Sequence, residues 1–250
     1  MYIDRIQYNG GISRSSYLNG LGAVRYFIKN GLLELDCPVS FFVGENGTGK
    51  STLIEAIAVR YGFNPEGGTK NFSFSTEDTH SSLYKHLTLS RTAFADDGFF
   101  LRAEGMYNAY SYINRLDGIQ SNAPKIISSY GGVSLHEQSH GESFLAVVQN
   151  RFGGNGLYIL DEPEAALSPL RQMTLLCEID RLVKSNSQFI IATHSPILMA
   201  YPDAAIYQLD NKGIKRISYD ECEHVNIYRR FLEAPERTIR YLFSDESNEE

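Results

Sequence analysis

The segment Val39-Ser-Phe-Phe-Val-Gly44-Glu-Asn-Gly-Thr-Gly-Lys-Ser51 decides the fold of this chain. Its first five residues predict a buried strand, and the pattern G-x-x-x-x-G-K-[ST] follows them directly. Glycines let the backbone curve into a nest of N–H groups that binds phosphate, and the start of the next helix adds its positive end. We expect Lys50 to contact the β- and γ-phosphates of a nucleotide and the Ser51 hydroxyl to bind Mg²⁺. The residues expected to hold the nucleotide are Gly44, Glu45, Asn46, Gly47, Thr48, Gly49, Lys50, Ser51 and Thr52.

The alternative is a glycine-rich turn that matches the pattern by chance. From the content of Gly, Lys, Ser and Thr, an accidental match is expected in roughly 1% of such sequences. A helix predicted over residues 51–60, with Gly62 after it, follows the loop as the pattern requires. We therefore interpret the segment as a nucleotide site.

Length and composition limit the class of protein. The 250 residues suffice for one large domain, and a hydrophobic content of 42% is ordinary for a globular chain. No apolar run approaches the ~18 residues of a membrane span, and the first residues lack the apolar region of a signal peptide. Three cysteines, Cys37, Cys177 and Cys222, show no metal or redox spacing. We expect a cytoplasmic protein, because an odd number of distant cysteines does not form a disulfide scaffold.

The charge balance gives no strong electrostatic attraction to polyanions. The net charge is −7, from 23 basic and 30 acidic residues. Four of the negative charges lie in the tail 244–250, so the rest of the chain carries −7 + 4 = −3. A global field that attracts nucleic acid or an anionic membrane is therefore not expected. The sequence is still compatible with a local basic patch.

The pattern of apolar residues predicts an α/β fold. We expect short strands and turns over residues 1–40, including strands at 23–28 and 32–35. Residues 63–137 are rich in Ser, Thr, His and Gly, with helical periodicity only at 81–89 and 109–116 and a strand at 98–103. We predict one domain over 1–250, with a core of 1–62 and 138–250 and an inserted lobe over 63–137.

Regular elements return in the second half. Helices are predicted at 141–151 and at 169–184, the latter opened by Ser168-Pro169, and strands at 157–160 and 188–193. A short helix, a hairpin across 210–213 and two closing helices complete the chain. Alternating strands and helices predict a mostly parallel sheet flanked by helices.

Two acids, Asp161 and Glu162, end the apolar strand Leu157-Tyr-Ile-Leu. Adjacent acids at the end of a strand can be a solvated turn. With a phosphate loop upstream, however, Asp161 is placed to hold Mg²⁺, and Glu162 to polarise the water that attacks the γ-phosphate. His194 follows the next strand, where a neutral imidazole can bond the γ-phosphate or orient Glu162. Its alternative is an exposed or structural histidine.

The segment Gln138-Ser-His-Gly-Glu-Ser-Phe144 precedes Asp161 by room for one helix and a turn. A phosphate loop, a Ser-x-Gly-[Gln/Glu] signature, an apolar-Asp-Glu-Pro strand and a histidine, in this order, resemble the ATP-binding cassette (ABC) ATPases. The resemblance covers 39–51 and 138–196. It implies an ABC-type P-loop fold with an N-terminal antiparallel β part. It also implies ATP and Mg²⁺ as ligands and a head-to-tail homodimer in which Ser139, Gly141 and Glu142 meet the γ-phosphate bound to the other chain.

Departures from the transporter pattern show which branch of the ABC ATPases the sequence resembles more. His140 replaces a Gly and Glu142 replaces the Gln of Leu-Ser-Gly-Gly-Gln, and Glu164-Ala-Ala-Leu-Ser168-Pro169 lacks the usual final Asp. These features are more similar to the soluble branch that includes chromosome-maintenance, Rad50-, RecF- and OLD-like ATPases, and the size is similar to the small stand-alone ABC-type ATPases of bacteria. The family's lobe-junction Gln has no clean match, with Gln120 and 102–104 as candidates. Its adenine-stacking aromatic could be Tyr17, Tyr26 or Phe27.

The leading hypothesis is an ATPase whose ATP-driven homodimer acts as a mechanical switch on a protein partner or nucleic acid. Glu162 and His194 are its expected catalytic residues. A regulatory ATPase in a bacterial defence pair would use the same chemistry for a different output. A transporter's nucleotide-binding subunit is disfavoured by the departures above, and a protein that binds ATP with little hydrolysis is disfavoured by the intact Glu162.

Overall fold

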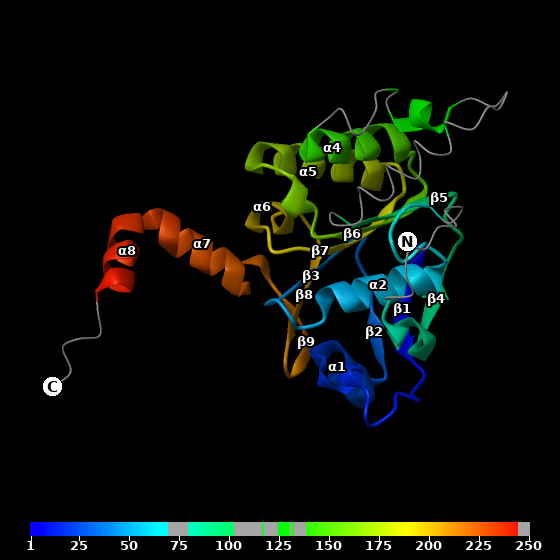
Figure 1. Ribbon diagram of the computed structural model, residues 1–250, viewed down its shortest axis with the longest axis horizontal. Helices are drawn as coiled ribbons and strands as arrows, with labels where there is room; N and C mark the ends of the chain where they lie inside the picture. Colours follow the sequence, from blue (N-terminus) through cyan, green and yellow to red (C-terminus); the bar gives the residue numbers. More distant parts are fainter. Residues whose placement is uncertain (70–79, 103–116, 118–124, 131, 133–138, 245–250) are drawn as a thin grey trace.

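A six-stranded sheet in the order β5-β6-β7-β3-β8-β9 forms the centre of the molecule (Figure 1). The structure is a computed structural model that describes residues 1–69, 80–102, 117, 125–130, 132 and 139–244. The strands of this sheet are β3 (Val39–Val43), β5 (Asp97–Arg102), β6 (Gly156–Asp161), β7 (Gln188–Ala192), β8 (Ala205–Asp210) and β9 (Gly213–Ile217). All neighbours pair in parallel except β8 and β9, which form the predicted hairpin. The expected α/β architecture with a mostly parallel sheet is confirmed.

A second, antiparallel sheet has the order β2-β1-β4. Its strands are β1 (Ile3–Tyr8), β2 (Leu32–Glu34) and β4 (Leu87–Arg91). This is the antiparallel part that the resemblance implied. Strands β4 and β5 both lie within 63–137, where we predicted an inserted lobe. The described part of that region therefore contributes one strand to each sheet, and the core extends beyond the predicted 1–62 and 138–250.

Helices cover both faces of the central sheet (Figure 1). The α-helices are α1 (Gly22–Asn30), α2 (Lys50–Tyr61), α4 (His140–Arg151), α5 (Pro169–Lys184), α6 (Pro196–Met199), α7 (Glu223–Glu233) and α8 (Pro235–Phe243). Alternate residues of each central strand point to opposite faces. Phe42 therefore packs with α1 and α2, while Phe41 packs with α4 and α5. Strands β3, β6 and β7 are buried along their whole length, which explains their nearly continuous apolar sequences.

Two predictions in the first half were wrong about the type of element. Residues 23–28 lie in α1 because Ala23, Val24 and Phe27 have the spacing of one helix face and are all buried. Residues 81–89, predicted as helical, form a short 3₁₀ helix, Ser82–His86, followed by β4. The helix predicted at 109–116 lies outside the described residues.

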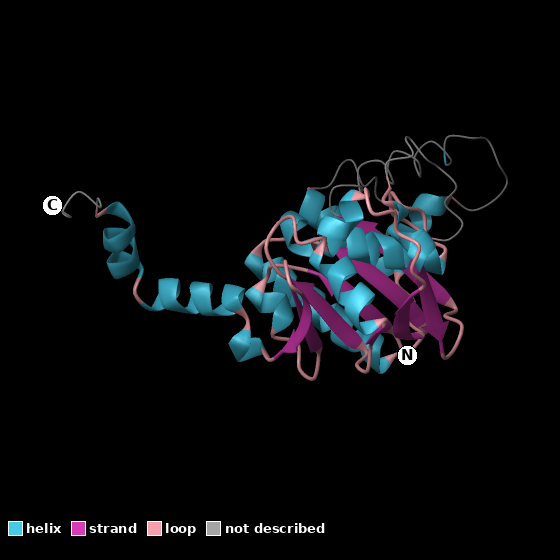
Figure 2. Cartoon of the chain, turned by 90° about the horizontal axis from the view of Figure 1, so that it is seen from below, coloured by secondary structure: helices cyan, strands magenta, loops and turns pink. Residues whose placement is uncertain are grey.

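The last two helices extend away from the body of the protein as an arm (Figure 2). The first turn of α7 is anchored, because Cys222 and Val225 are buried beside α6. Beyond that turn the arm exposes large apolar side chains, which are Ile227, Tyr228, Phe231, Leu232, Ile239, Tyr241, Leu242 and Phe243. None of the helices in the described ranges combines the length and the apolar character that a membrane span requires.

Candidate nucleotide site

Three parallel strands end at one edge of the sheet and bring the predicted site residues together. In register, Asp161 at the end of β6 pairs with Ala192 of β7, and Ala192 pairs with Phe42 of β3. The loops that follow these strands carry the phosphate loop, Glu162 and His194. The carboxyl ends of parallel strands are where α/β folds bind ligands, because the connecting loops diverge there.

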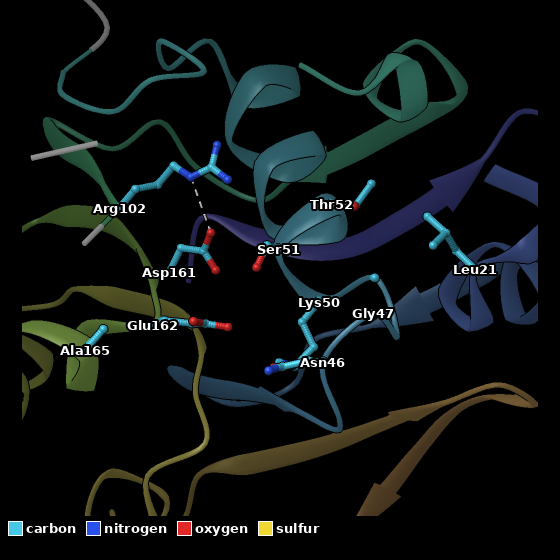
Figure 3. Close-up of a pocket in the computed structure, with 11 residues that line it drawn as sticks. Leu21, Asn46, Gly47, Lys50, Ser51, Thr52, Arg102, Asp161, Glu162 and Ala165 are labelled. Carbon is cyan, nitrogen blue, oxygen red and sulfur yellow. Dashed lines mark ion pairs between the residues drawn. The ribbon is translucent and has the colours of Figure 1, made fainter. Parts of the chain in front are cut away.

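A cavity of about 510 Å³ opens at this edge (Figure 3). It is lined by Leu21, Asn46, Gly47, Gly49, Lys50, Ser51, Thr52, Arg102, Asp161, Glu162 and Ala165. Six of these residues were predicted from the phosphate-loop pattern and two from the acidic pair. The other predicted loop residues, Gly44, Glu45 and Thr48, shape the loop from outside the cavity lining.

Gly44 shows why the loop requires glycine where it leaves β3. Its φ is +145°, and a Cβ there would lie 2.2 Å from the carbonyl oxygen of Leu209. A larger residue would push the loop away from β8 and change its curvature. Thr48 then closes the turn by donating its hydroxyl hydrogen to the Glu45 carbonyl at 2.8 Å.

Lys50 is buried at the first residue of α2, with its ammonium held inside the loop. Its Nζ donates to the Gly44 carbonyl at 2.7 Å and to the Glu45 carbonyl at 3.2 Å. Burial lowers the pKa of Lys50, while the nearby carboxylates of Glu162 and Asp161 act in the opposite direction. A partly desolvated ammonium beside a ring of backbone N–H groups is suited to bind phosphate oxygens.

Asp161 is nearly buried, with 6% exposure, and faces the cavity (Figure 3). Arg102 lies beside it, with Nε 3.4 Å from Asp161 Oδ2 and a terminal nitrogen 2.8 Å from Glu55 Oε2. The sequence placed 102–104 where the family has its lobe-junction Gln, and Arg102 does line the cavity. Its side chain is a cation and not an amide. The other candidate for that role, Gln120, lies outside the described residues.

The chemistry of the donors at this point fits Mg²⁺. Asp161 and Ser51 both line the cavity and direct their oxygens into it (Figure 3). A carboxylate and a hydroxyl are hard oxygen ligands, which Mg²⁺ prefers when phosphates and water complete its coordination. The predicted pair is therefore suitable as a magnesium site. A bound Mg²⁺ would supply charge neutralisation of the phosphates.

Glu162 follows directly and adopts a left-handed backbone, with φ 50° and ψ 53°. Non-glycine residues occupy this region only where surrounding structure holds them, and such residues gather at functional sites. The Glu162 N–H donates to the Ala192 carbonyl at 3.0 Å, which fixes the turn. The carboxylate faces the cavity, with Oε1 3.7 Å from His194 Nε2.

Glu164, which the sequence analysis treated only as part of a motif, positions the His194 segment. One oxygen of its carboxylate accepts the N–H of His194, and the other accepts the hydroxyl hydrogen of Thr193 at 2.7 Å. Burial raises the pKa of Glu164, and the charge of Glu162 adds to this, while the bonds from His194 and Thr193 act in the opposite direction. In the sequence, the only sign of this role was the position of Glu164 directly after Asp-Glu-Pro.

His194 lies beside the carboxylates of Glu162 and Glu164. Its pKa is lowered chiefly by burial and further by the positive charge of Lys50, while Glu162 acts in the opposite direction. The imidazole is therefore neutral near pH 7. Its Nδ1 lies 3.2 Å from Nε2 of His224, a residue of α7 that the sequence gave no reason to select.

The predicted signature forms the start of α4. Ser139 is its N-cap, and Ser139 and Glu142 form a capping box, in which Glu142 Oε2 accepts from the Ser139 N–H and hydroxyl. Gly141 permits close packing, because a Cβ there would lie 2.6 Å from Arg171 and 2.7 Å from the Ala166 carbonyl. Arg171 donates to Ser139 Oγ at 3.1 Å. The remaining residue of the predicted segment, Gln138, lies outside the described residues.

The structure does not bring the signature to the cavity of its own chain. Among the described residues that line the cavity, none belongs to α4 or its cap. Ser139 and Glu142 are instead exposed.

The three aromatic candidates for adenine stacking lie in different environments. Phe27 is fully buried in the core, and Tyr26 lines a separate pocket beside β2. Both are therefore poorly placed to stack on a base. Tyr17 is 66% exposed and lies just before Leu21, which lines the phosphate cavity. Tyr17 stays a prediction.

Two family models match parts of the chain. One, described as an AAA domain, putative AbiEii toxin, Type IV TA system, matches residues 130–200, and the other, described as an AAA domain, matches residues 20–97. The second match contains the phosphate loop. The first contains the signature, the acidic pair and His194.

Similar proteins include the ribose import ATP-binding proteins (RbsA) from two strains of Bacillus cereus. Each is 26% identical over 221 residues, which are 80% of this chain and 44% of the relative. The chain thus spans less than half the length of these proteins. Among solved structures, CbiO1 of Clostridium perfringens is 16% identical with a TM-score of 0.49, over 98% of this chain and 100% of that one. The SMC head domain of Thermotoga maritima is 16% identical with a TM-score of 0.45, over 87% and 99%.

Proposed function

Because the chain is a P-loop ATPase of the AAA/ABC type, we propose that it hydrolyses Mg-ATP between the two copies of a head-to-tail homodimer. Closure on ATP and release after hydrolysis would act as a mechanical switch on a partner protein or nucleic acid. One observation supports the proposal: Lys50, Ser51, Asp161 and Glu162 line one cavity, while the signature, a capped helix start, is exposed outside it.

The residues of the cavity divide the chemistry among them. Lys50 and the loop N–H groups bind the phosphates, and Ser51 with Asp161 would hold Mg²⁺. Glu162 accepts a proton from the attacking water, and its fixed turn keeps the carboxylate aimed into the cavity. A neutral His194 donates from Nε2 to the γ-phosphate or the water. Ser139, Gly141 and Glu142 of the second chain would close on the same phosphate.

The test separates binding, closure and chemistry. Glu162→Gln protein, which keeps the shape but not the base, should be monomeric without nucleotide or with ADP and dimeric with Mg-ATP, as measured by sedimentation. Adding Ser139→Arg should abolish the dimer and leave ATP affinity unchanged, because the new bulk opposes closure only across the interface. The same mass in every nucleotide state, or a persistent Ser139→Arg dimer, would contradict the sandwich.

The second candidate function is that of an ATPase component in a bacterial defence pair. It is favoured by the match of residues 130–200 to a family whose description names a putative toxin of a type IV system. Expression of the chain in a bacterial host, with and without the product of its neighbouring gene, tests this role. Growth arrest relieved by the neighbour and abolished by Lys50→Ala would support it, and unaffected growth would argue against it.

The third candidate, a transporter subunit, is what the ribose import relatives suggest. Glu142 in place of the transporter Gln argues against it. Copurification of a membrane protein with the chain from its native host would favour this candidate over the switch.

A further inference from the structure

We infer that His224 is a positioning residue that holds His194 in the tautomer with its proton on Nε2, the nitrogen that faces Glu162. The inference rests on the proposed function for its kinetic consequence, but its structural part does not. The contact that carries it joins His194 Nδ1 to His224 Nε2 at 3.2 Å. No feature of the sequence marks His224, since it lies 30 residues beyond His194 on a different helix.

Two arrangements of protons satisfy this hydrogen bond. Either His224 Nε2–H donates to His194 Nδ1, which leaves the His194 proton on Nε2, or His194 Nδ1–H donates to His224 Nε2. In the second arrangement, the His194 Nε2 lone pair would face the Glu162 carboxylate. A neutral imidazole has one donor and one acceptor nitrogen, so the partner of one nitrogen decides the role of the other.

Two carboxylates select the first arrangement. Glu162 Oε1 lies 3.7 Å from His194 Nε2, and Glu45 Oε1 lies 3.7 Å from His224 Nε2. A proton on a nitrogen near a carboxylate is attracted to it, whereas a bare lone pair on that nitrogen is repelled. Both Nε2 atoms should therefore carry protons, and His224 donates to His194.

The position of His224 is rigid enough for this role. It is the second residue of α7, between Cys222 and Val225, which are both buried against the core. The His224 side chain is only 16% exposed, and its ring meets that of His194 edge to face at a centroid distance of 5.0 Å. An imidazole held on both sides in this way keeps the His194 ring from rotating.

Two amide substitutions form a matched pair for the test. The Gln amide nitrogen reaches the position of His Nε2, while the Asn amide stops at the position of Nδ1. His224→Gln should therefore keep the donor to His194, and His224→Asn should lose it, although both variants place a similar polar group at the start of α7. Long-range ¹H–¹⁵N correlation spectra of protein labelled at histidine nitrogen report the tautomer directly, and His194→Gln protein assigns the signal.

We expect the Nε2–H tautomer at His194 in the parent and in His224→Gln, and a mixed or reversed tautomer in His224→Asn. In steady-state assays, kcat should fall about tenfold in His224→Asn and recover in His224→Gln, with KM for ATP within twofold throughout. An unchanged tautomer in His224→Asn, or equal kcat in both variants, overturns the inference. If the parent itself hydrolyses no ATP, the proposed function fails, and the spectra still decide the role of His224.

Discussion

The Arg171 guanidinium donates a hydrogen bond of 3.0 Å to the Glu142 carboxylate, which joins α5 to the first turn of α4. Bonds from Ser139 lower the pKa of Glu142, and Arg171 lowers it further, so this signature residue is a carboxylate at neutral pH. A carboxylate that closes on a γ-phosphate would repel it. In the proposed dimer, we expect Arg171 to neutralise the Glu142 charge before it approaches the γ-phosphate.

Arg171→Gln should weaken the Mg-ATP dimer of Glu162→Gln protein by about tenfold or more, because it exposes a like-charge contact across the interface. Adding Glu142→Gln should restore the dimer, since the repulsive charge is then gone. Sedimentation equilibrium measures both, and Arg181→Gln, on the same helix but paired with Glu178, is the control. Equal dimer affinities with and without Arg171 would exclude this role.

Lys50→Ala should lower ATP affinity by about 100-fold or more, since it leaves the phosphate charge without its ammonium partner. Isothermal calorimetry gives the dissociation constant. Lys212→Ala, which removes an exposed ammonium, should bind like the parent. Unchanged affinity in Lys50→Ala would remove the nucleotide site from this loop.

Glu162→Gln should reduce ATP turnover by about 100-fold or more, because the amide cannot accept the proton of the attacking water. Nucleotide affinity should stay within a few-fold of the parent value. A phosphate-release assay compares the variant with Glu236→Gln, which changes an exposed carboxylate of α8. Hydrolysis at the parental rate would mean that Glu162 only shapes the turn.

His194 should make the folded state less stable at mildly acidic pH. Burial and Lys50 lower the pKa of His194 in the folded state. At mildly acidic pH the unfolded chain therefore binds a proton at His194 more readily than the folded protein does. The free energy of unfolding then decreases as pH falls below about 6.5. Urea denaturation at pH 7.5 and 5.5 should show a smaller pH effect in His194→Gln than in the parent. A difference of zero between the two proteins would contradict the lowered pKa.

Asp97 holds the edge strand β5 to the body of the protein. Its carboxylate accepts from Arg151 at 2.8 Å, from the Tyr158 hydroxyl at 2.8 Å and from the Gly153 N–H at 3.1 Å. Burial alone would raise the pKa of Asp97, but these donors outweigh burial and lower it. The stabilisation is therefore present above the unfolded pKa of about 4 and lost as pH falls through the lower folded value.

Asp97→Asn should accordingly reduce the free energy of unfolding by about 1–3 kcal/mol, since it leaves the buried Tyr158 hydroxyl and the half-buried Arg151 without a charged acceptor. Denaturant unfolding near pH 7 measures the loss. Asp220→Asn, which alters an exposed pair with Arg229, should change stability little. Equal losses in the two variants would show that the Asp97 network adds nothing beyond a surface pair.

Local patterns were sufficient for the centre of the fold and for eight of the eleven residues that line the cavity. The strand before Gly44, the helix after Lys50 and the strand that ends at Asp161 each combine a clear period with a clear boundary. Residues 23–28 were misassigned because a run of six apolar and polar residues satisfies both a strand and a helix period. Only the burial of Ala23, Val24 and Phe27 on one face decides between them.

The residues that sequence reasoning missed act through tertiary contacts. Arg171 meets Glu142 from 29 positions away, and His224 meets His194 from 30. Neither pair has a characteristic spacing, because the distance along the chain is set by whole helices and strands between them. Such partners become visible only when the elements are packed.

The arm of α7 and α8 has a mechanical consequence. Helices transmit a pull or a twist along their length, and α7 begins at the turn that carries His224 and ends among exposed apolar side chains. A molecule bound to those side chains would therefore apply its force at the anchored first turn of α7, where His224 lies beside both His194 and Glu45 of the phosphate loop. In the proposed ATPase, a load on the arm would therefore reach His194 and the nucleotide-binding loop together, through the His224 side chain.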